Sequence, residues 1–215
     1  MKKYLNAIGE LEKRTAAKWD PQNQTHKILF TGLKRLGDQV RAIDTLSSVA
    51  HDAGTMMRAL NRLSTLTDAE ELNFNKLVGE TQKSFEAALR EKAGLTPGPY
   101  GPELRARLHA MNPGERVKAV HELIKAHDGS TLAAIFDAPS MLTGLSEADI
   151  STFREQYYQT ACPGLVKARD TFQDLSEHVG AAVNTCRKIS LEYSDPAKLK
   201  ELEAQEAAVK AAQGE

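Results

Sequence analysis

The segment HELIKAH holds the residue types that bind zinc on a helix, with His121, Glu122 and His127 in one short stretch. A helical zinc motif needs its two histidines four residues apart, because only then do both rings reach one ion. Here the histidines are six residues apart, which on a helix turns them roughly 120° away from each other. We therefore expect no metal site and interpret both as satisfied or solvent-exposed residues.

The sequence contains none of several other motifs that are typical of catalysis or cofactor binding. The glycine-rich stretch GPYGP, residues 98–102, lacks the Lys and the following Ser or Thr of a phosphate-binding loop. No G-x-S-x-G elbow and no C-x-x-C pair occur. The aromatic pair Tyr157 and Tyr158 would suit stacking on a base or sugar, although one ring in the core and one at the surface is more typical. We predict a protein that is not an enzyme and that carries no cofactor.

Composition sets limits on partners and location. Lys and Arg number 28 against 29 Asp and Glu, a formal net charge of −1, which argues against nucleic-acid binding through a general basic excess. The cysteines Cys162 and Cys186 suggest buried thiols in a reducing compartment, with a single bridge as the alternative. No run of 18 apolar residues or secretory leader is found, so we expect a cytoplasmic protein without a membrane span.

Apolar residues recur at helical spacing along nearly the whole chain, which predicts an all-α multi-helix bundle. Two long heptad-patterned helices, at about 25–63 and 165–193, are expected around several shorter ones. The first has a phase shift near 43–49 and contains three glycines, so two or three helices are the alternative to a single one. Its opening stretch, HKILFTG, is alternatively a short strand. The second has an unbroken apolar seam: Leu165, Ala168, Phe172, Leu175, Val179, Ala182, Cys186, Ile189 and Tyr193.

Local signals predict where the shorter helices begin and end. A first helix covers 2–18 and ends before Asp20-Pro21, and a capping box at Thr67–Glu70 begins a helix that ends at Gly94. Further helices are expected at 104–111, from Asn112-Pro113 to about 127, and at 130–137. Ser146 with Asp149 begins another, which presents Ile150, Phe153 and Tyr157 inward and ends at Cys162-Pro163-Gly164. The connector before it carries Met141 and Leu142, which we expect to lie under neighbouring helices.

The Pro- and Gly-rich stretch TPGPYGP is the plainest linker in the chain. It divides the sequence into an N-terminal helical region, 1–95, a linker, 96–102, and a C-terminal helical region, 103–194. A tail at 195–215, rich in Ala, Glu and Lys, has only Leu199, Leu202 and Val209 as apolar anchors, so it would fray alone or dock on a partner. A single domain overall is the alternative.

The run AIFDAPSMLTGLSEADISTFREQYYQTACP, residues 134–163, resembles a segment of uncharacterised bacteriophage and prophage proteins. The similarity rests on a small-Pro-x-Leu connector, an acidic helix start and an Arg-Glu-Gln-Tyr core: Ala138, Pro139, Leu142, Gly144, Leu145, Arg154, Glu155, Gln156 and Tyr157. The resemblance implies a phage-encoded protein and carries no activity with it.

These features together predict a structural or assembly protein that acts through helix–helix contacts with itself or with another structural protein, in the cytoplasm or in a phage particle. The long seams would pair either with each other or with a second copy. Trp19 serves either as a contact residue or as the closure of the first helix. The candidate interface residues are Trp19, Leu165, Phe172, Leu175, Val179, Ile189, Leu199 and Leu202. The alternative is a small regulatory module that binds a host protein or nucleic acid.

Overall fold

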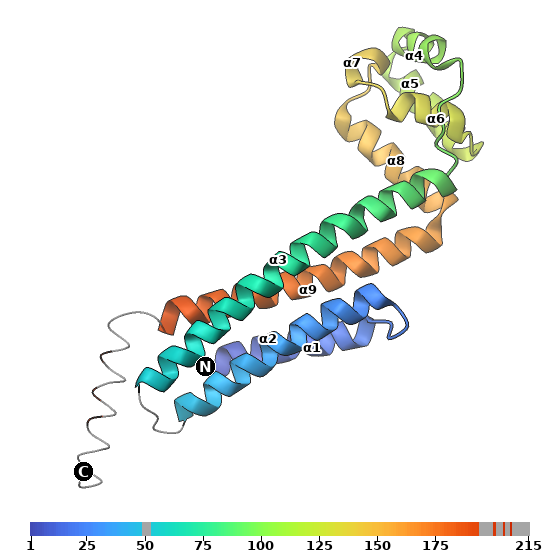
Figure 1. The fold of residues 1–215 in the computed structure, drawn as a ribbon. Helices are drawn as coiled ribbons and strands as arrows, with labels where there is room; N and C mark the ends of the chain where they lie inside the picture. Colours follow the sequence, from blue (N-terminus) through green and yellow to red (C-terminus); the bar gives the residue numbers. More distant parts are fainter. Residues whose placement is uncertain (49–52, 194–199, 201–203, 205–206, 208–215) are drawn as a thin grey trace. The chain divides into compact units, whose positions relative to one another are not determined.

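The computed structural model describes residues 1–48, 53–193, 200, 204 and 207, and all the regular structure in these ranges is helical (Figure 1). The predicted all-α fold is therefore confirmed, and no described helix is long and apolar enough to cross a membrane. The elements are α1 (Lys2–Lys18), α2 (Gln24–Ser48), α3 (Ala53–Lys92), α4 (Gly101–Ala110), α5 (Pro113–Lys125), α6 (Gly129–Phe136), α7 (Ser140–Thr143), α8 (Glu147–Ala161) and α9 (Pro163–Tyr193).

The chain forms two compact units. Unit 1 consists of residues 1–80 and 171–215, and unit 2 consists of residues 81–170. The Pro- and Gly-rich stretch 96–102 lies inside unit 2, and the predicted regions 1–95 and 103–194 each contribute to both units. The division falls within the long helices α3 and α9, because packing partners rather than local composition determine which residues form a compact body.

Unit 1 is a bundle in which α1, α2, the first part of α3 and the later part of α9 lie side by side (Figure 1). Its core is almost entirely aliphatic, and ion pairs at its surface join each helix to a neighbour. Fully buried side chains include Ile8, Leu33, Leu36, Ile43, Leu60, Leu63, Leu175 and Ile189. The pairs are Arg41–Glu12 between α1 and α2, Arg35–Glu70 between α2 and α3, Arg187–Glu71 between α3 and α9, and Lys18–Asp174 between α1 and α9.

The helix start predicted at Thr67 is wrong, because α3 runs without a break from Ala53 to Lys92. Met56, Leu60, Leu63 and Thr67 are all buried and follow steps of 4, 3 and 4, so one continuous face packs into the bundle. The Thr67 hydroxyl donates to the Leu63 carbonyl oxygen at 2.7 Å instead of capping a helix. Burial of this face outweighs the local capping signal.

The segment 25–63 belongs to two helices, in agreement with the alternative of two or three helices rather than one. α2 ends at Ser48 and α3 begins at Ala53, with 49–52 outside the described residues. The stretch HKILFTG is helical and not a strand. Leu29 is 3 % exposed and Leu33 is fully buried, so the predicted apolar positions of this helix face the core.

The seam of α9 closes within the chain over most of its length. From Phe172 to Ile189 each predicted position is buried, so the intramolecular alternative is the one observed. Ala168 is exposed, which corrects the prediction at that end, and Val166 is buried instead. A strict seven-residue repeat drifts by about 20° per heptad on a straight helix. The buried face has therefore rotated by the time the helix reaches its first turns.

Unit 2 contains α4 to α8 with the end of α3 and the start of α9, and its core is centred on α6 and α8. The predicted start of α8 is confirmed: the Ser146 hydroxyl accepts from the Asp149 N–H while the Asp149 carboxylate accepts from the Ser146 N–H. Ile150, Phe153 and Tyr157 are buried as expected. Unit 2 is thus held by short capped helices around a mixed aliphatic and aromatic core.

Candidate protein-binding groove

A groove of about 430 Å³ lies between α4, α5 and α6 on the surface of unit 2. Its two long walls are stripes with the same spacing, i, i+3, i+4 and i+7, which places each set on one side of its helix. α4 contributes Leu104, Arg107 and Leu108, with its C-cap Met111; α5 contributes Ala119, Glu122 and Leu123, with its C-cap Ala126; Thr131 and Ile135 of α6 close the groove. Each long wall is therefore apolar with one charged residue.

The start of α5 is set by a reciprocal cap. The Asn112 side chain accepts from the Glu115 N–H at 2.9 Å, and the Glu115 carboxylate accepts from the Asn112 N–H at 3.1 Å. Pro113 occupies the first turn, where its missing N–H costs nothing. This cap was expected from Asn112 and Pro113, and Glu115 completes it.

Arg116 fixes α4 against α5. Its guanidinium donates to the carbonyl oxygens of Leu108 at 3.1 Å and His109 at 2.9 Å, which belong to the last turn of α4. It also donates to the Gly144 carbonyl oxygen at 2.6 Å. A side chain from the first turn of α5 thus satisfies acceptors at the end of α4, so the two groove walls are preformed.

The floor of the groove rests on the core of unit 2. Leu108 and Ile135 are buried, whereas Met111, Ala119 and Leu123 are partly buried and pack against the same core cluster. Side chains that contact the core below and the groove above leave apolar surface facing water. Such surface is a candidate for burial against another molecule.

The two charges of the groove differ in their surroundings. Glu122 accepts from Lys125 at 2.9 Å, and this hydrogen bond is the main cause of a lowered pKa for its carboxyl. Arg107 is exposed, and among the described residues no ion pair involves it. The α4 wall therefore offers a cation that can pair with an acidic residue from outside.

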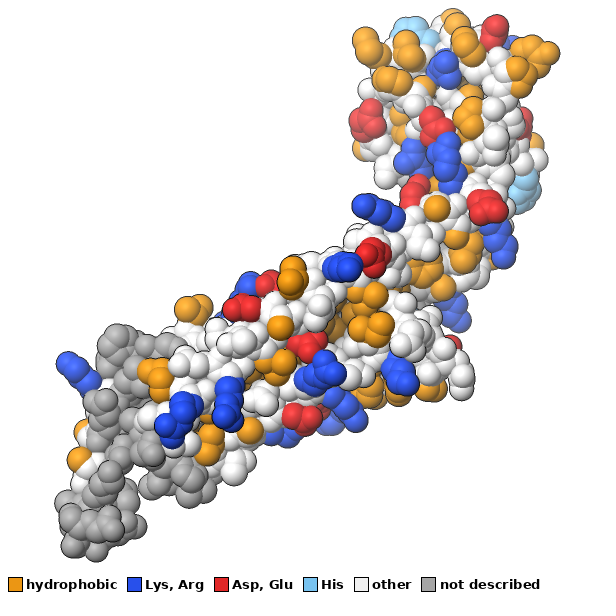
Figure 2. Space-filling view, viewed as in Figure 1, with side chains coloured by type: hydrophobic (Ala, Val, Ile, Leu, Met, Phe, Trp, Pro, Cys, Tyr) orange, Lys and Arg blue, Asp and Glu red, His pale blue; other side chains and the backbone are white. Residues whose placement is uncertain are grey.

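The expectation that Met141 and Leu142 lie under neighbouring helices is wrong. Met141 is 77 % exposed and Leu142 48 % exposed, and both line a second hollow of about 460 Å³ beside Pro102, Arg105 and His109. The buried positions in this connector are Thr143 and Leu145 instead. The short helix α7 (Ser140–Thr143), which is capped by Gly144 in a left-handed conformation, turns Thr143 into the core and leaves Met141 and Leu142 exposed. Figure 2 shows hydrophobic side chains gathered on the surface of unit 2.

The predicted interface residues of α9 lie in the core of unit 1. Phe172, Leu175, Val179 and Ile189 are each no more than 3 % exposed, so they already have partners in the chain. Leu165 is half-buried against the core of unit 2. Their burial explains the seam without any second molecule.

Trp19 is half-buried and stacks on Phe30 with 4.6 Å between ring centroids. This contact closes the turn between α1 and α2. Leu199 and Leu202 lie outside the described residues.

The tyrosine pair of α8 does not divide between core and surface, because both rings are buried. The Tyr157 hydroxyl donates to the Ala93 carbonyl oxygen at 2.8 Å. Tyr158 bonds Glu86, and burial is the main cause that raises the pKa of Tyr158 to about 12. These contacts explain the pair as packing with satisfied hydroxyls.

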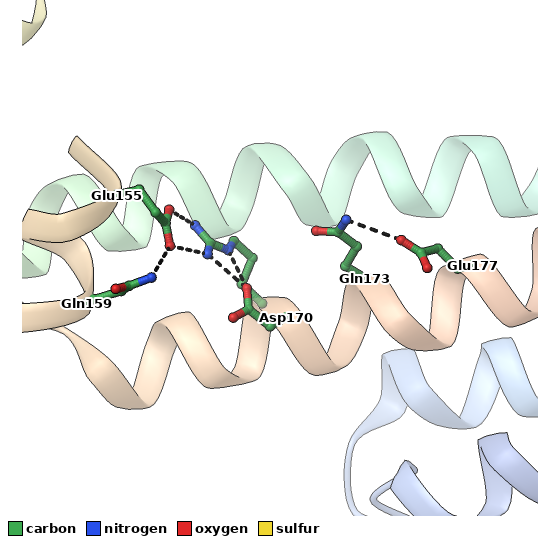
Figure 3. A network of polar contacts seen from close by, with 6 residues as sticks. Glu155, Gln159, Asp170, Gln173 and Glu177 are labelled. Carbon is green, nitrogen blue, oxygen red and sulfur yellow. Dashed lines mark hydrogen bonds and ion pairs between the residues drawn. The ribbon is translucent and has the colours of Figure 1, made fainter. Parts of the chain in front are cut away.

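Polar contacts around Arg169 join α8 to the start of α9 (Figure 3). The guanidinium donates two hydrogen bonds to the Glu155 carboxylate, each 2.8 Å, and two to the Asp170 carboxylate, at 3.0 and 2.8 Å. Gln159 donates to the same Glu155 carboxylate, and the Arg169 bonds are the first cause of the lowered pKa of Glu155. The arrangement braces the turn at Cys162-Pro163.

The histidines considered for zinc take structural positions. His121 packs edge-on against Phe153, and His127 adopts a left-handed backbone at the end of α5. Within the described residues, no three His, Cys, Asp or Glu side chains are grouped so as to hold a metal. Cys162 and Cys186 are free and buried, as interpreted, so they do not form the alternative bridge.

A further groove of about 420 Å³ lies between α2 and α3 in unit 1. Most of its lining is polar or charged, including Lys27, Arg35, Glu70, Lys76 and Glu80, and the Arg35–Glu70 ion pair spans it at 3.1 Å. Covering it would take several charged side chains out of water, so the groove of unit 2 is the stronger candidate.

Comparison with known protein families, with curated proteins and with solved structures finds no match for this chain. The candidate site therefore rests on the geometry of the molecule alone. Sequence reasoning did not identify the stripes of α4 and α5, although their i, i+3, i+4, i+7 spacing is readable. The same spacing marks any helix that faces a core, so the pattern does not tell which face stays uncovered.

Proposed function

We propose that this protein is a non-enzymatic structural or assembly protein that associates with further copies of itself through the groove of unit 2. The observation that carries the proposal is the pair of facing stripes on α4 and α5. Two adjacent helices with apolar stripes at heptad spacing form the seat into which one more helix packs. The resemblance of residues 134–163 to bacteriophage proteins supports a role within a phage particle.

A helical occupant would remove apolar surface of the groove from water. Each apolar square ångström removed from water contributes roughly 25 cal/mol. Leu104, Met111 and Leu123 are partly exposed in the free chain, so their remaining surface is available for burial. A docked helix would bury all three side chains together, whereas in the free chain their apolar surface stays exposed to water, which is unfavourable.

The test is the mass in solution, measured by light scattering over a concentration series. Ala126→Arg places a long charged side chain at the exposed edge of the groove, where Glu122 one turn earlier can accept it, so folding should be unaffected. Ala110→Arg is the matched control, because Ala110 is an exposed residue of α4 that does not line the groove.

We expect a discrete oligomer for the native chain and for Ala110→Arg, and a monomer for Ala126→Arg at the same concentrations. A native chain that stays monomeric at high micromolar concentration would refute self-association. An Ala126→Arg chain with the native mass would place the interface elsewhere.

A further inference from the structure

The occupant of the groove can be specified further from the chain's own sequence, resting on the proposed self-association. We propose that the groove of unit 2 binds the C-terminal segment, residues 196–215, of a second copy. Of this segment the structure describes Lys200, Ala204 and Ala207, which are helical and exposed. On a continuous helix these three would share one side, with Leu202, Glu206 and Val209 on the other side and Leu199 at its edge.

The charge in that stripe is opposite to the charge on the α4 wall of the groove. Leu199, Leu202 and Val209 are apolar, and Glu206 interrupts them. The α4 wall has the complementary pattern, because Arg107, which has no ion pair within the described part of the chain, lies among apolar residues. An acidic residue within an apolar face disfavours burial against a purely apolar surface and favours a seat that offers a cation.

The spacing matches as well if the segment lies antiparallel to α4. Leu104, Arg107 and Met111 are separated by steps of 3 and 4, and so are Val209, Glu206 and Leu202 when read backwards. Val209 then faces Leu104, Glu206 faces Arg107 and Leu202 faces Met111. Antiparallel helices whose contacting residues alternate between steps of 3 and 4 keep those residues in register along the seam.

The segment has reason to dock, because a short helix with few apolar anchors is marginal in water. Docking buries those anchors and stabilises the helix at the same time. Each copy has this groove and one C-terminal segment. Every chain can therefore bind the segment of one copy and insert its own segment into the groove of another. This reciprocity would build a closed oligomer or an open array from one kind of contact.

The experiment is a charge swap on the full chain, followed by light scattering. Arg107→Glu leaves the C-terminal segment intact and spoils the groove, and Glu206→Arg does the reverse. We expect each variant alone to be monomeric and an equimolar mixture to recover the native oligomer, because each groove then meets a segment of opposite charge. Lys118→Glu, an exposed charge reversal on α5 outside the groove, should retain the native mass.

The second readout is the fluorescence anisotropy of a labelled peptide of residues 196–215. The peptide is titrated with the Glu206→Arg chain, whose groove is intact. Arg107→Glu on that background should weaken its binding by about tenfold, since an attraction becomes a repulsion. If Glu206→Arg keeps the native mass while Ala126→Arg is monomeric, the segment is not the occupant and the proposed function stands. If the mixture does not recover the oligomer, exchange between copies is refuted. A native chain that never associates refutes the proposed function itself.

Discussion

The burial of the α9 seam predicts a large difference between two chemically identical substitutions. Leu175 and Leu191 belong to the same helix, but Leu175 is fully buried and Leu191 is 77 % exposed. Leu→Ala at either position removes the same atoms. Any difference in the free energy of unfolding therefore reports on the surroundings alone.

The magnitude at Leu175 follows from what surrounds it. Losing three buried carbons costs about 0.8 kcal/mol each in transfer free energy, or roughly 2.4 kcal/mol. The cavity left behind adds to this, and buried Leu→Ala changes span about 2.7–5.0 kcal/mol. At Leu191 the side chain is already in water, so we expect a change within about 0.5 kcal/mol.

The assay is urea unfolding followed by tryptophan fluorescence. Trp19 is the one tryptophan of the chain and stacks on Phe30 inside unit 1, so its emission reports on the unit that contains both leucines. Leu175→Ala should lower the midpoint strongly at an unchanged slope, and Leu191→Ala should not. Equal shifts for the two variants would refute the burial of the seam.

Further predictions concern groups whose surroundings are equally specific. Burial lowers the pKa of His26 and His178 in the folded state, while the unfolded chain takes up these protons at the ordinary value of about 6.5. Stability should thus be constant above pH 6.5 and fall as the pH drops through the folded pKa values; urea midpoints at pH 7.5 and 5.5 that agree would contradict this. Tyr157→Phe leaves the Ala93 carbonyl oxygen without its 2.8 Å donor and should cost about 1–2 kcal/mol by thermal unfolding, against no loss if water replaces the hydroxyl. Burial raises the pKa of the Cys186 thiol to about 11, so a thiol reagent at pH 8 should label it only after urea is added; rapid labelling of the native chain would show that α9 opens.

The elements that could be predicted from sequence are those whose signals are local. The start of α8 followed from Ser146 and Asp149, and the structure contains both hydrogen bonds of that cap. The start of α5 followed from Asn112 and Pro113. In each case neighbouring residues alone satisfy the orphan backbone donors, so no tertiary information is needed.

The errors arose where tertiary packing decides. Thr67 and Glu70 have the spacing of a cap, yet Glu70 pairs with Arg35 of α2 and Thr67 is buried, so α3 continues. Met141 and Leu142 looked like core residues by type, but α7 buries Thr143 and leaves both of them exposed. The groove eluded prediction for the same reason: Leu104 and Leu123 have the spacing of core residues, and only the three-dimensional arrangement leaves them partly uncovered.

The division of the chain has a consequence for the order of its folding. Unit 2 is a single continuous segment, residues 81–170, whereas unit 1 needs residues from both sides of it. During synthesis unit 2 is therefore complete first, and α1, α2 and the first part of α3 must wait for the later part of α9. The aliphatic faces around Leu33 and Leu60, which are buried in the complete bundle, lack the α9 part of their packing during that interval. A permuted chain in which residues 171–193 are placed ahead of Met1 would supply the α9 partner earlier, and it should aggregate less during cell-free synthesis than the natural order.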